Sequence, residues 1–212
     1  MTISELSQGK LSERFVRAFE YAARAHATQT RKGKDLPYIS HLMSVASLVL
    51  EAGGDEDMTI AALLHDAVED QGGQPTLREI ERRFGKRVAQ MVWDCTDADT
   101  MPKPPWRQRK ETYLAHLPSV SAESRVVAAA DKVHNAREIL ADYREEGEKV
   151  WERFRGGREG TLWYYRALAD ELCALESNRL TRELDRVVTE LERLAAANQL
   201  AAAHEPASHL HE

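Results

Sequence analysis

Hydrophobic residues recur along the chain at intervals of three and four, the spacing that places them on one face of an α-helix. The first stretch with this spacing predicts a helix over residues 12–27, with apolar positions at Leu11, Phe15, Ala18, Phe19, Ala22 and Ala25. Ala, Leu, Glu and Arg are abundant, and no stretch alternates apolar and polar residues for long enough to predict a strand. The pattern therefore predicts an all-α fold.

Glycine and proline divide the rest of the chain. The basic segment 29–38 contains Gly33 and Pro37, which predict a loop. The three prolines within residues 102–105 make a helix implausible before Trp106. Between these breaks the pattern predicts helices over residues 40–51, 56–71, 76–84, 86–96, 121–140, 158–176 and 178–197.

Capping residues mark the ends of several predicted helices. Gly53-Gly54 is expected to end the helix over 40–51, and Asp55 to cap the one that follows. Thr76 and Glu79 have the spacing of a capping box, which predicts the start of the short helix at residue 76.

The length of 212 residues suits one stable domain, expected over residues 1–198, with residues 199–212 as a flexible C-terminal tail. The two cysteines, Cys95 and Cys173, are too few and too far apart for a disulfide framework, which fits a reducing cytoplasm. No signal-peptide pattern and no apolar run of about 20 residues is present. A cytoplasmic protein without a membrane partner is expected, and a homo-oligomer is left open.

The charge balance limits the class of ligand. With 29 basic and 35 acidic residues, the chain has a formal net charge of −6 and no general field to hold a nucleic acid. Any site for phosphate groups must therefore be a local basic pocket.

The segment HDAVED concentrates ionisable side chains in the most apolar predicted helix. Glu69 lies four residues after His65, and Asp70 lies four after Asp66, so all four share one edge of the helix. Three carboxylates so close raise one another's pKa and destabilise the fold unless a cation or a hydrogen-bond network compensates. A divalent metal is the simplest compensation, and the alternative is the solvated polar edge of an amphipathic helix.

Two further residues favour the metal interpretation. His41 begins the preceding helix, and Asp131 interrupts the small, apolar run RVVAAADKVHNA, where packing alone gives no reason for a carboxylate. Two histidines and two aspartates suit a divalent ion with open water positions.

Three segments carry a family resemblance: RKGKDLPYISH, AALLHDAVED and ADKVHNAR. With the order H…HD…D, the chain resembles the HD superfamily of metal-dependent phosphohydrolases. The resemblance is closer to the hydrolase domains of Rel/Spo proteins and their stand-alone relatives, the small alarmone hydrolases, and it spans roughly residues 12–170. It implies an HD-domain helical bundle of about eight to ten helices.

The resemblance also implies a reaction. One manganese ion (Mn²⁺) would be held by His41, His65, Asp66 and Asp131, with Glu69 and Asp70 as catalytic residues that position and activate the attacking water. Family members remove pyrophosphate from the 3′ position of guanosine tetraphosphate or pentaphosphate, (p)ppGpp, to give GDP or GTP. A metal lowers the pKa of bound water and, with basic side chains, offsets phosphoryl charge.

Candidate substrate-binding residues follow from the same resemblance, each with an ordinary surface or core role as its alternative. Arg31 and Lys32 of the basic loop would border the base, and Asn135, four residues after Asp131, would contact the nucleoside. In the segment TDADTMPKPPWRQRK, Lys103, Arg107, Arg109 and Lys110 are all candidates for phosphate, and Lys103 with Arg107 is the pair we favour. Weaker candidates are Arg24, Arg158 and Tyr165.

Other histidines are not expected to bind the metal. This prediction covers His26, His116 and His134, while His204, His209 and His211 belong to the expected tail. Alternative activities are hydrolysis of the adenosine analogues, (p)ppApp, and removal of the 2′-phosphate of NADPH. An alternative of another class is a non-catalytic nucleotide sensor, which the intact Glu69-Asp70 pair disfavours.

Overall fold

The computed structural model describes residues 11–98 and 102–204, with side chains as far as residue 200. Within these ranges the chain is almost entirely helical, and its only β-type pairing is an isolated bridge between Thr30 and Pro37 in the basic loop. The all-α prediction is confirmed. The elements are α1 (Glu13–Ala25), α2 (Ile39–Glu51), α3 (Glu56–Leu64), α4 (Ala67–Gln71), α5 (Gln74–Phe84), α6 (Lys86–Cys95), α7 (Trp106–His116), η2 (Leu117–Ser119), α8 (Ala122–Glu146), η3 (Gly147–Arg153), α9 (Gly157–Leu175) and α10 (Arg179–His204).

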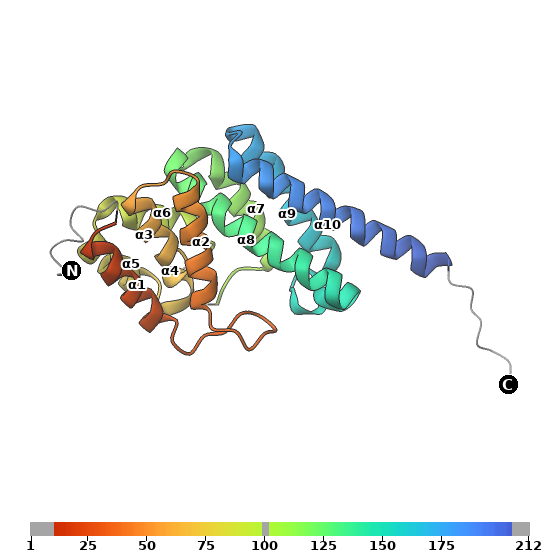
Figure 1. The fold of residues 1–212 in the computed structure, drawn as a ribbon, viewed down its shortest axis with the longest axis horizontal. Helices are drawn as coiled ribbons and strands as arrows, with labels where there is room; N and C mark the ends of the chain where they lie inside the picture. Colours follow the sequence, from red (N-terminus) through yellow and green to blue (C-terminus); the bar gives the residue numbers. More distant parts are fainter. Residues whose placement is uncertain (1–10, 99–101, 205–212) are drawn as a thin grey trace.

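The centre of the N-terminal part is α3, which packs against α1, α2, α6 and α8 (Figure 1). Its residues from Thr59 to Leu64 are all buried, which explains why this helix has no polar face. The long helix α8 leaves this core and also packs against η3, α9 and α10. It therefore joins the two parts of the fold, and α10 continues beyond the body of the molecule (Figure 1).

The predicted helix over 56–71 is broken, which corrects the sequence interpretation. The α3 helix ends at Leu64 and α4 begins at Ala67, with His65 and Asp66 between them. His65 Nδ1 donates to the carbonyl oxygen of Ala62 at 2.8 Å, and such side-chain bonds compete with the backbone bonds of a helix. Two of the candidate metal ligands therefore lie at a joint between helices.

The predicted capping box is wrong. The α5 helix begins at Gln74, with Gly73 before it at a φ of 63° and Pro75 in its first turn, where proline favours a helix start. The Thr76 hydroxyl instead donates to the carbonyl oxygen of Gln71, and Glu79 pairs with Arg82 and Arg83.

At the other end of the chain, α10 runs to His204, beyond the predicted end at residue 197 and into the expected tail. His209 and His211 lie outside the described residues. Both Cys95 and Cys173 are free thiols. Among the described helices, none combines the length and hydropathy needed to cross a bilayer. The predictions about domain boundary, location, oligomer and absence of nucleic-acid partners stay predictions.

Asp55 is the N-cap of α3, as predicted, and accepts a hydrogen bond from the backbone N–H of Met58 at 3.0 Å. Replacing Asp55 with alanine should lower the free energy of unfolding by about 1 kcal/mol, because an orphan N–H at the helix start loses its acceptor. Urea titration measures this loss. Asp55→Asn keeps an acceptor but, like alanine, loses the ion pair with Arg87. Equal stability of the two variants would contradict a capping role.

Candidate active site

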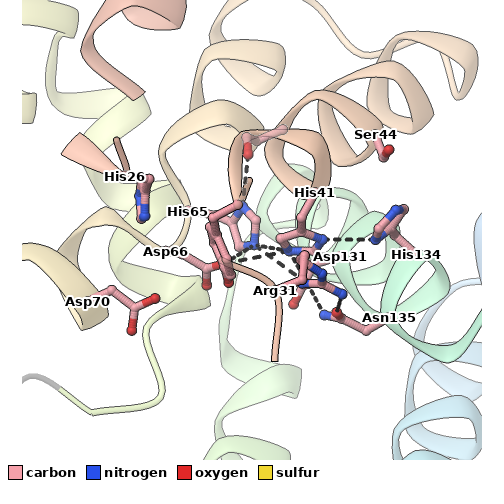
Figure 2. Close-up of polar contacts among 12 residues, drawn as sticks. His26, Arg31, His41, Ser44, His65, Asp66, Asp70, Asp131, His134 and Asn135 are labelled. Atoms are coloured by element: carbon pink, nitrogen blue, oxygen red, sulfur yellow. Dashed lines mark hydrogen bonds and ion pairs between the residues drawn. The ribbon is translucent and has the colours of Figure 1, made fainter. Parts of the chain in front are cut away.

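Four side chains from three separate elements converge beside the centre of the fold (Figure 2). His41 comes from α2, His65 and Asp66 from the α3–α4 joint, and Asp131 from α8. The two imidazole Nε2 atoms are 3.3 Å apart. Asp66 Oδ2 lies 3.5 Å from His41 Nε2 and 3.1 Å from His65 Nε2, and Asp131 Oδ1 lies 3.2 and 3.5 Å from the same two atoms.

Both imidazoles are held with Nε2 facing the carboxylates. His65 is 1% exposed and His41 is fully buried. On the far side of each ring, His65 Nδ1 bonds the carbonyl oxygen of Ala62, and His41 Nδ1 lies 2.9 Å from His134 Nδ1. Fixing the second ring nitrogen is how proteins orient histidine ligands of metals. His134 therefore orients His41 from outside the cluster of converging atoms, and its exclusion from the ligands stays a prediction.

The electrostatics of this cluster favour positive charge at its centre. Burial acts against protonation of His65, but the carboxylates of Asp66 and Asp131 outweigh it and raise the pKa of His65 well above its usual value. Burial likewise acts to raise the pKa of Asp131, but Lys132 and the two imidazoles hold it well below the usual range. The raised pKa of His65 follows from the two carboxylates beside it, and the same carboxylates would attract a metal cation.

The donor set fits a divalent metal. His41, His65 and Asp66 each offer an atom within 4.8 Å of the others, and Asp131 adjoins both imidazoles. Bonds of about 2.1 Å from one ion to cis ligands place neighbouring donors roughly 3.0–3.4 Å apart, close to the distances found here. Two imidazoles and two carboxylates suit Mn²⁺, Fe²⁺ or Zn²⁺ better than a soft metal.

Two residues that the sequence interpretation missed brace the carboxylates. The Tyr38 hydroxyl donates to Asp66 Oδ2 at 2.6 Å, and Lys132 Nζ lies 2.6 Å from Asp131 Oδ2. Tyr38 lies three residues before His41 in the segment PYISH, and Lys132 follows Asp131 directly. Their positions next to ligands in the sequence were the available signal.

A cavity of about 810 Å³ opens beside the cluster. Tyr38, Lys132 and Asn135 line it, and each bonds a carboxylate of the cluster, so the cavity adjoins the candidate metal centre. The predicted site residues that line it are Arg31, Lys32, Glu69, Asp70, Lys103, Arg109, Lys110, Asn135 and Tyr165.

Three predicted substrate-binding residues do not reach this cavity, and we correct them. Arg24 pairs with Glu20 on its own helix and lines a separate groove formed by α1 and α5. Arg158 donates to the carbonyl oxygen of Ala195 in α10. Arg107 stacks on Trp163 and pairs with Glu111.

Arg107 was predicted to bind phosphate, and the direction in which it points from α7 explains why it does not reach the cavity. Trp106, Arg109 and Lys110 have the three- and four-residue spacing of one helix face and line the cavity, whereas Arg107 lies on another face. Arg109 and Lys110 both pair with Asp97. Of the favoured pair, Lys103 alone reaches the cavity.

The adjacent carboxylates Glu69 and Asp70 have different surroundings. Lys103 Nζ lies 2.8 Å from Glu69 Oε1, and Arg109 is 3.9 Å from the same atom. Asp70 accepts a hydrogen bond from the neutral amide of Gln29 at 2.8 Å. Burial, followed by repulsion from Asp66, raises the pKa of Asp70 above its usual value. Glu69 is therefore held by cations, while the raised pKa of Asp70 makes it a better proton acceptor than an ordinary aspartate.

The basic loop is attached to α8 at the opposite wall. Arg31 donates to Asn135 Oδ1 at 2.8 Å, and Asn135 Nδ2 donates to Asp131 Oδ1 at 2.5 Å, which links the loop to the cluster. Lys34 and Arg153 both pair with Asp142. Lys34, which belongs to the predicted basic loop, lines this wall together with Arg153, Phe154 and Arg155, which the sequence interpretation missed.

Known proteins resemble this chain in sequence and fold. Residues 18–162 match the family described as HD domain. The guanosine-3′,5′-bis(diphosphate) 3′-pyrophosphohydrolase MESH1 of Xenopus tropicalis is 39% identical over 125 residues, covering 58% of this chain and 67% of the relative. The Homo sapiens protein of the same name is 37% identical over 134 residues, or 62% and 72%. A solved structure, described as a metazoan ortholog of SpoT that hydrolyzes ppGpp, has a TM-score of 0.70 at 26% identity and covers 85% of this chain and 96% of its own.

Proposed function

Because this chain belongs to the HD-domain family, and its relatives include stand-alone 3′-pyrophosphohydrolases, we propose that it is a metal-dependent hydrolase of (p)ppGpp. The reaction releases pyrophosphate from the 3′ position and leaves GDP or GTP. The observation that carries the proposal is the convergence of His41, His65, Asp66 and Asp131 beside a cavity lined by cations.

We propose Mn²⁺ as the ion held by these four residues. A bound divalent ion supplies a more acidic water and a positive charge beside the phosphoryl oxygens. Tyr38 holds Asp66 at Oδ2, the oxygen that faces the imidazoles, and Lys132 holds Asp131 at Oδ2, the oxygen that faces away from them. His134 fixes the ring of His41. These contacts orient the donors before the substrate arrives.

Asp70 and Glu69 divide the remaining work in this proposal. Asp70 takes a proton from the attacking water while a bond forms between the water oxygen and the phosphorus. The bond from phosphorus to the 3′ oxygen breaks, and the 3′ oxygen takes up a proton from solvent to become the hydroxyl of GDP or GTP. Its raised pKa and its neutral partner favour this role. Glu69 holds Lys103 beside the reacting phosphate, where a positive charge stabilises the developing negative charge.

The nucleotide would lie along the cationic walls of the cavity. Arg31 and Asn135 are linked to Asp131 and would contact the nucleoside, whereas Lys32 and Arg155 offer charge for the 5′-phosphates. Burial, followed by repulsion from Arg155, lowers the pKa of Lys32, so an anion between these two cations would be stabilised. This supports a small, highly phosphorylated nucleotide as the substrate.

The test is a substrate panel with metal controls. Purified protein loaded with Mn²⁺ should release pyrophosphate from guanosine 3′-pyrophosphates, and EDTA should stop the reaction. The panel includes the adenosine analogues and NADPH, which the cavity chemistry also accommodates because each presents a ribose phosphate. Absence of product from every nucleotide, with the protein folded and loaded, would overturn the proposal, and binding without turnover would indicate a sensor.

A further inference from the structure

A hydrogen-bond network of His26, Gln29 and Gln71 connects the end of α1, the basic loop and the end of α4 beside Asp70. Gln29 Nε2 donates to Asp70 Oδ2 at 2.8 Å. Gln29 Oε1 lies 2.7 Å from His26 Nδ1 and 2.8 Å from Gln71 Nε2. The sequence pattern singled out Asp70 for function, but it gave no functional role to Gln29, His26 or Gln71.

The chemistry of the groups fixes the orientation of the Gln29 amide. A carboxylate only accepts hydrogen bonds, so the NH₂ end of Gln29 must face Asp70. The carbonyl end then faces His26 and Gln71, and each of them has an N–H to donate to it. An amide held at its oxygen by two donors cannot flip without losing both bonds.

The same network also contacts the candidate metal ligand Asp66, through His26 and Tyr38. His26 is 3% exposed, and its ring stacks on Tyr38 with centroids 5.2 Å apart and planes inclined by 21°. The Tyr38 hydroxyl donates to Asp66 Oδ2. Asp66 and Asp70 are therefore linked through a continuous set of side chains, in which the stacked rings of His26 and Tyr38 lie between Gln29 and Asp66.

The partner of Asp70 differs in kind from the partners of Glu69. Within residues 11–98 and 102–200, no Lys, Arg or His forms an ion pair with Asp70 within 4.0 Å, whereas Lys103 and Arg109 both reach Glu69. A cation bound to Asp70 would weaken it as a base, but an amide directs it without neutralising it. This is the arrangement that a proton-accepting carboxylate needs.

We infer that Gln29 is a positioning residue that aims the Asp70 carboxylate at the attacking water, with His26 and Gln71 locking the Gln29 amide. The inference rests on the proposed function, since it gives Asp70 the role of base. Gln29 acts through Asp70 and does not itself touch the reacting atoms.

Two substitutions of Gln29 by side chains of similar size distinguish a role in positioning Asp70 from a role in packing alone. Gln29→Met keeps the length of the side chain and removes the donor, and kcat should fall about 10-fold with KM within about twofold. Gln29→Glu keeps the polar shape but sets a second carboxylate against Asp70, so kcat should fall further, by about 100-fold. A role in packing alone predicts the opposite order, because glutamate is the closer match in shape.

The chain offers a matched control and a second variant. Gln90 donates to Asp94 at 2.7 Å on α6, and neither residue lines the cavity, so Gln90→Leu removes a Gln–Asp bond outside the site and should leave kcat unchanged. His26→Phe keeps a ring over Tyr38 but removes a donor to Gln29, and it should lower kcat by less than Gln29→Met does. Melting temperatures with and without Mn²⁺ identify any variant that fails to fold.

The outcomes distinguish this inference from the proposed function. If Gln29→Met and Gln29→Glu both keep kcat within twofold, or if their losses appear only in KM, the inference is wrong. If the wild-type protein turns over no nucleotide, the proposed function fails, and crystal structures decide the inference separately. Asp70 should then leave its observed rotamer in Gln29→Met and keep it in Gln90→Leu, and an unmoved Asp70 would refute the positioning role.

Discussion

Replacing Asp131 with asparagine should abolish both divalent-metal binding and turnover. Asp131 Oδ1 lies 3.2 and 3.5 Å from the two imidazole Nε2 atoms, and a neutral amide there removes one of the two negative charges that attract the ion. An ion present at a concentration of 100 times its dissociation constant stabilises a protein by about 2.7 kcal/mol. For a chain of this length, that corresponds to a rise of about 5–10 °C in melting temperature. We expect Mn²⁺ to raise the melting temperature of the wild type by this amount and to leave the variant unchanged.

Each variant must be compared with itself, by its melting temperature with and without Mn²⁺. Asp131 also pairs with half-buried Lys132, so loss of the Asp131 carboxylate should destabilise the protein even without metal. Asp94→Asn is the matched control. Asp94 is another buried aspartate, on α6, and accepts a hydrogen bond from Ser124. A full Mn²⁺ effect in Asp131→Asn would remove Asp131 from the ligands, and a lost effect in Asp94→Asn would mean that the assay reports general instability.

Replacing Asp70 with asparagine should lower kcat by about 10²–10⁴-fold, the range typical of losing a general base, while sparing nucleotide binding. The substitution keeps the shape of the side chain and relieves repulsion from Asp66, so we expect no loss of stability. Single-turnover rates and calorimetric titration of the nucleotide measure the two effects separately.

Glu69→Gln provides the contrast within the same pair. It weakens the hold on Lys103, so its loss should appear in both KM and kcat. Activity of Asp70→Asn equal to that of the wild type would remove Asp70 from the mechanism, and with it the role inferred for Gln29.

The helices were predictable because the fold buries part of each apolar face, although Phe19, which the spacing also placed on the apolar face of α1, is 37% exposed. Ala18 and Ala22 of α1 are fully buried, as the spacing of residues 12–27 requires. The joint at His65-Asp66 was not predictable, since the segment reads as one continuous helix. It depends on the bond from His65 to Ala62, and that bond forms beside His41 and Asp131, which are distant in sequence.

The candidate ligands could be identified because each is a polar side chain within an apolar run. The substrate side was harder, since positions on a surface helix depend on its phase. Arg107 and Arg109 are both arginines in the same segment. Their directions depend on where α7 begins and how it packs, and in the structure Arg109 lines the cavity whereas Arg107 does not. Arg158 was misassigned because its partner, Ala195, comes from a helix whose placement the sequence does not define.

The helix α8 sets the length of one wall of the cavity. Asp131, Asn135, Glu138 and Asp142 follow one another at intervals of three and four residues, so they form a row along one face. A rise of 1.5 Å per residue places the two ends of this row roughly 16 Å apart. The length of a helix is fixed by its number of residues, so relatives that keep this row would have a cavity of the same length. Differences in their choice of nucleotide would then come from the side chains that line the cavity.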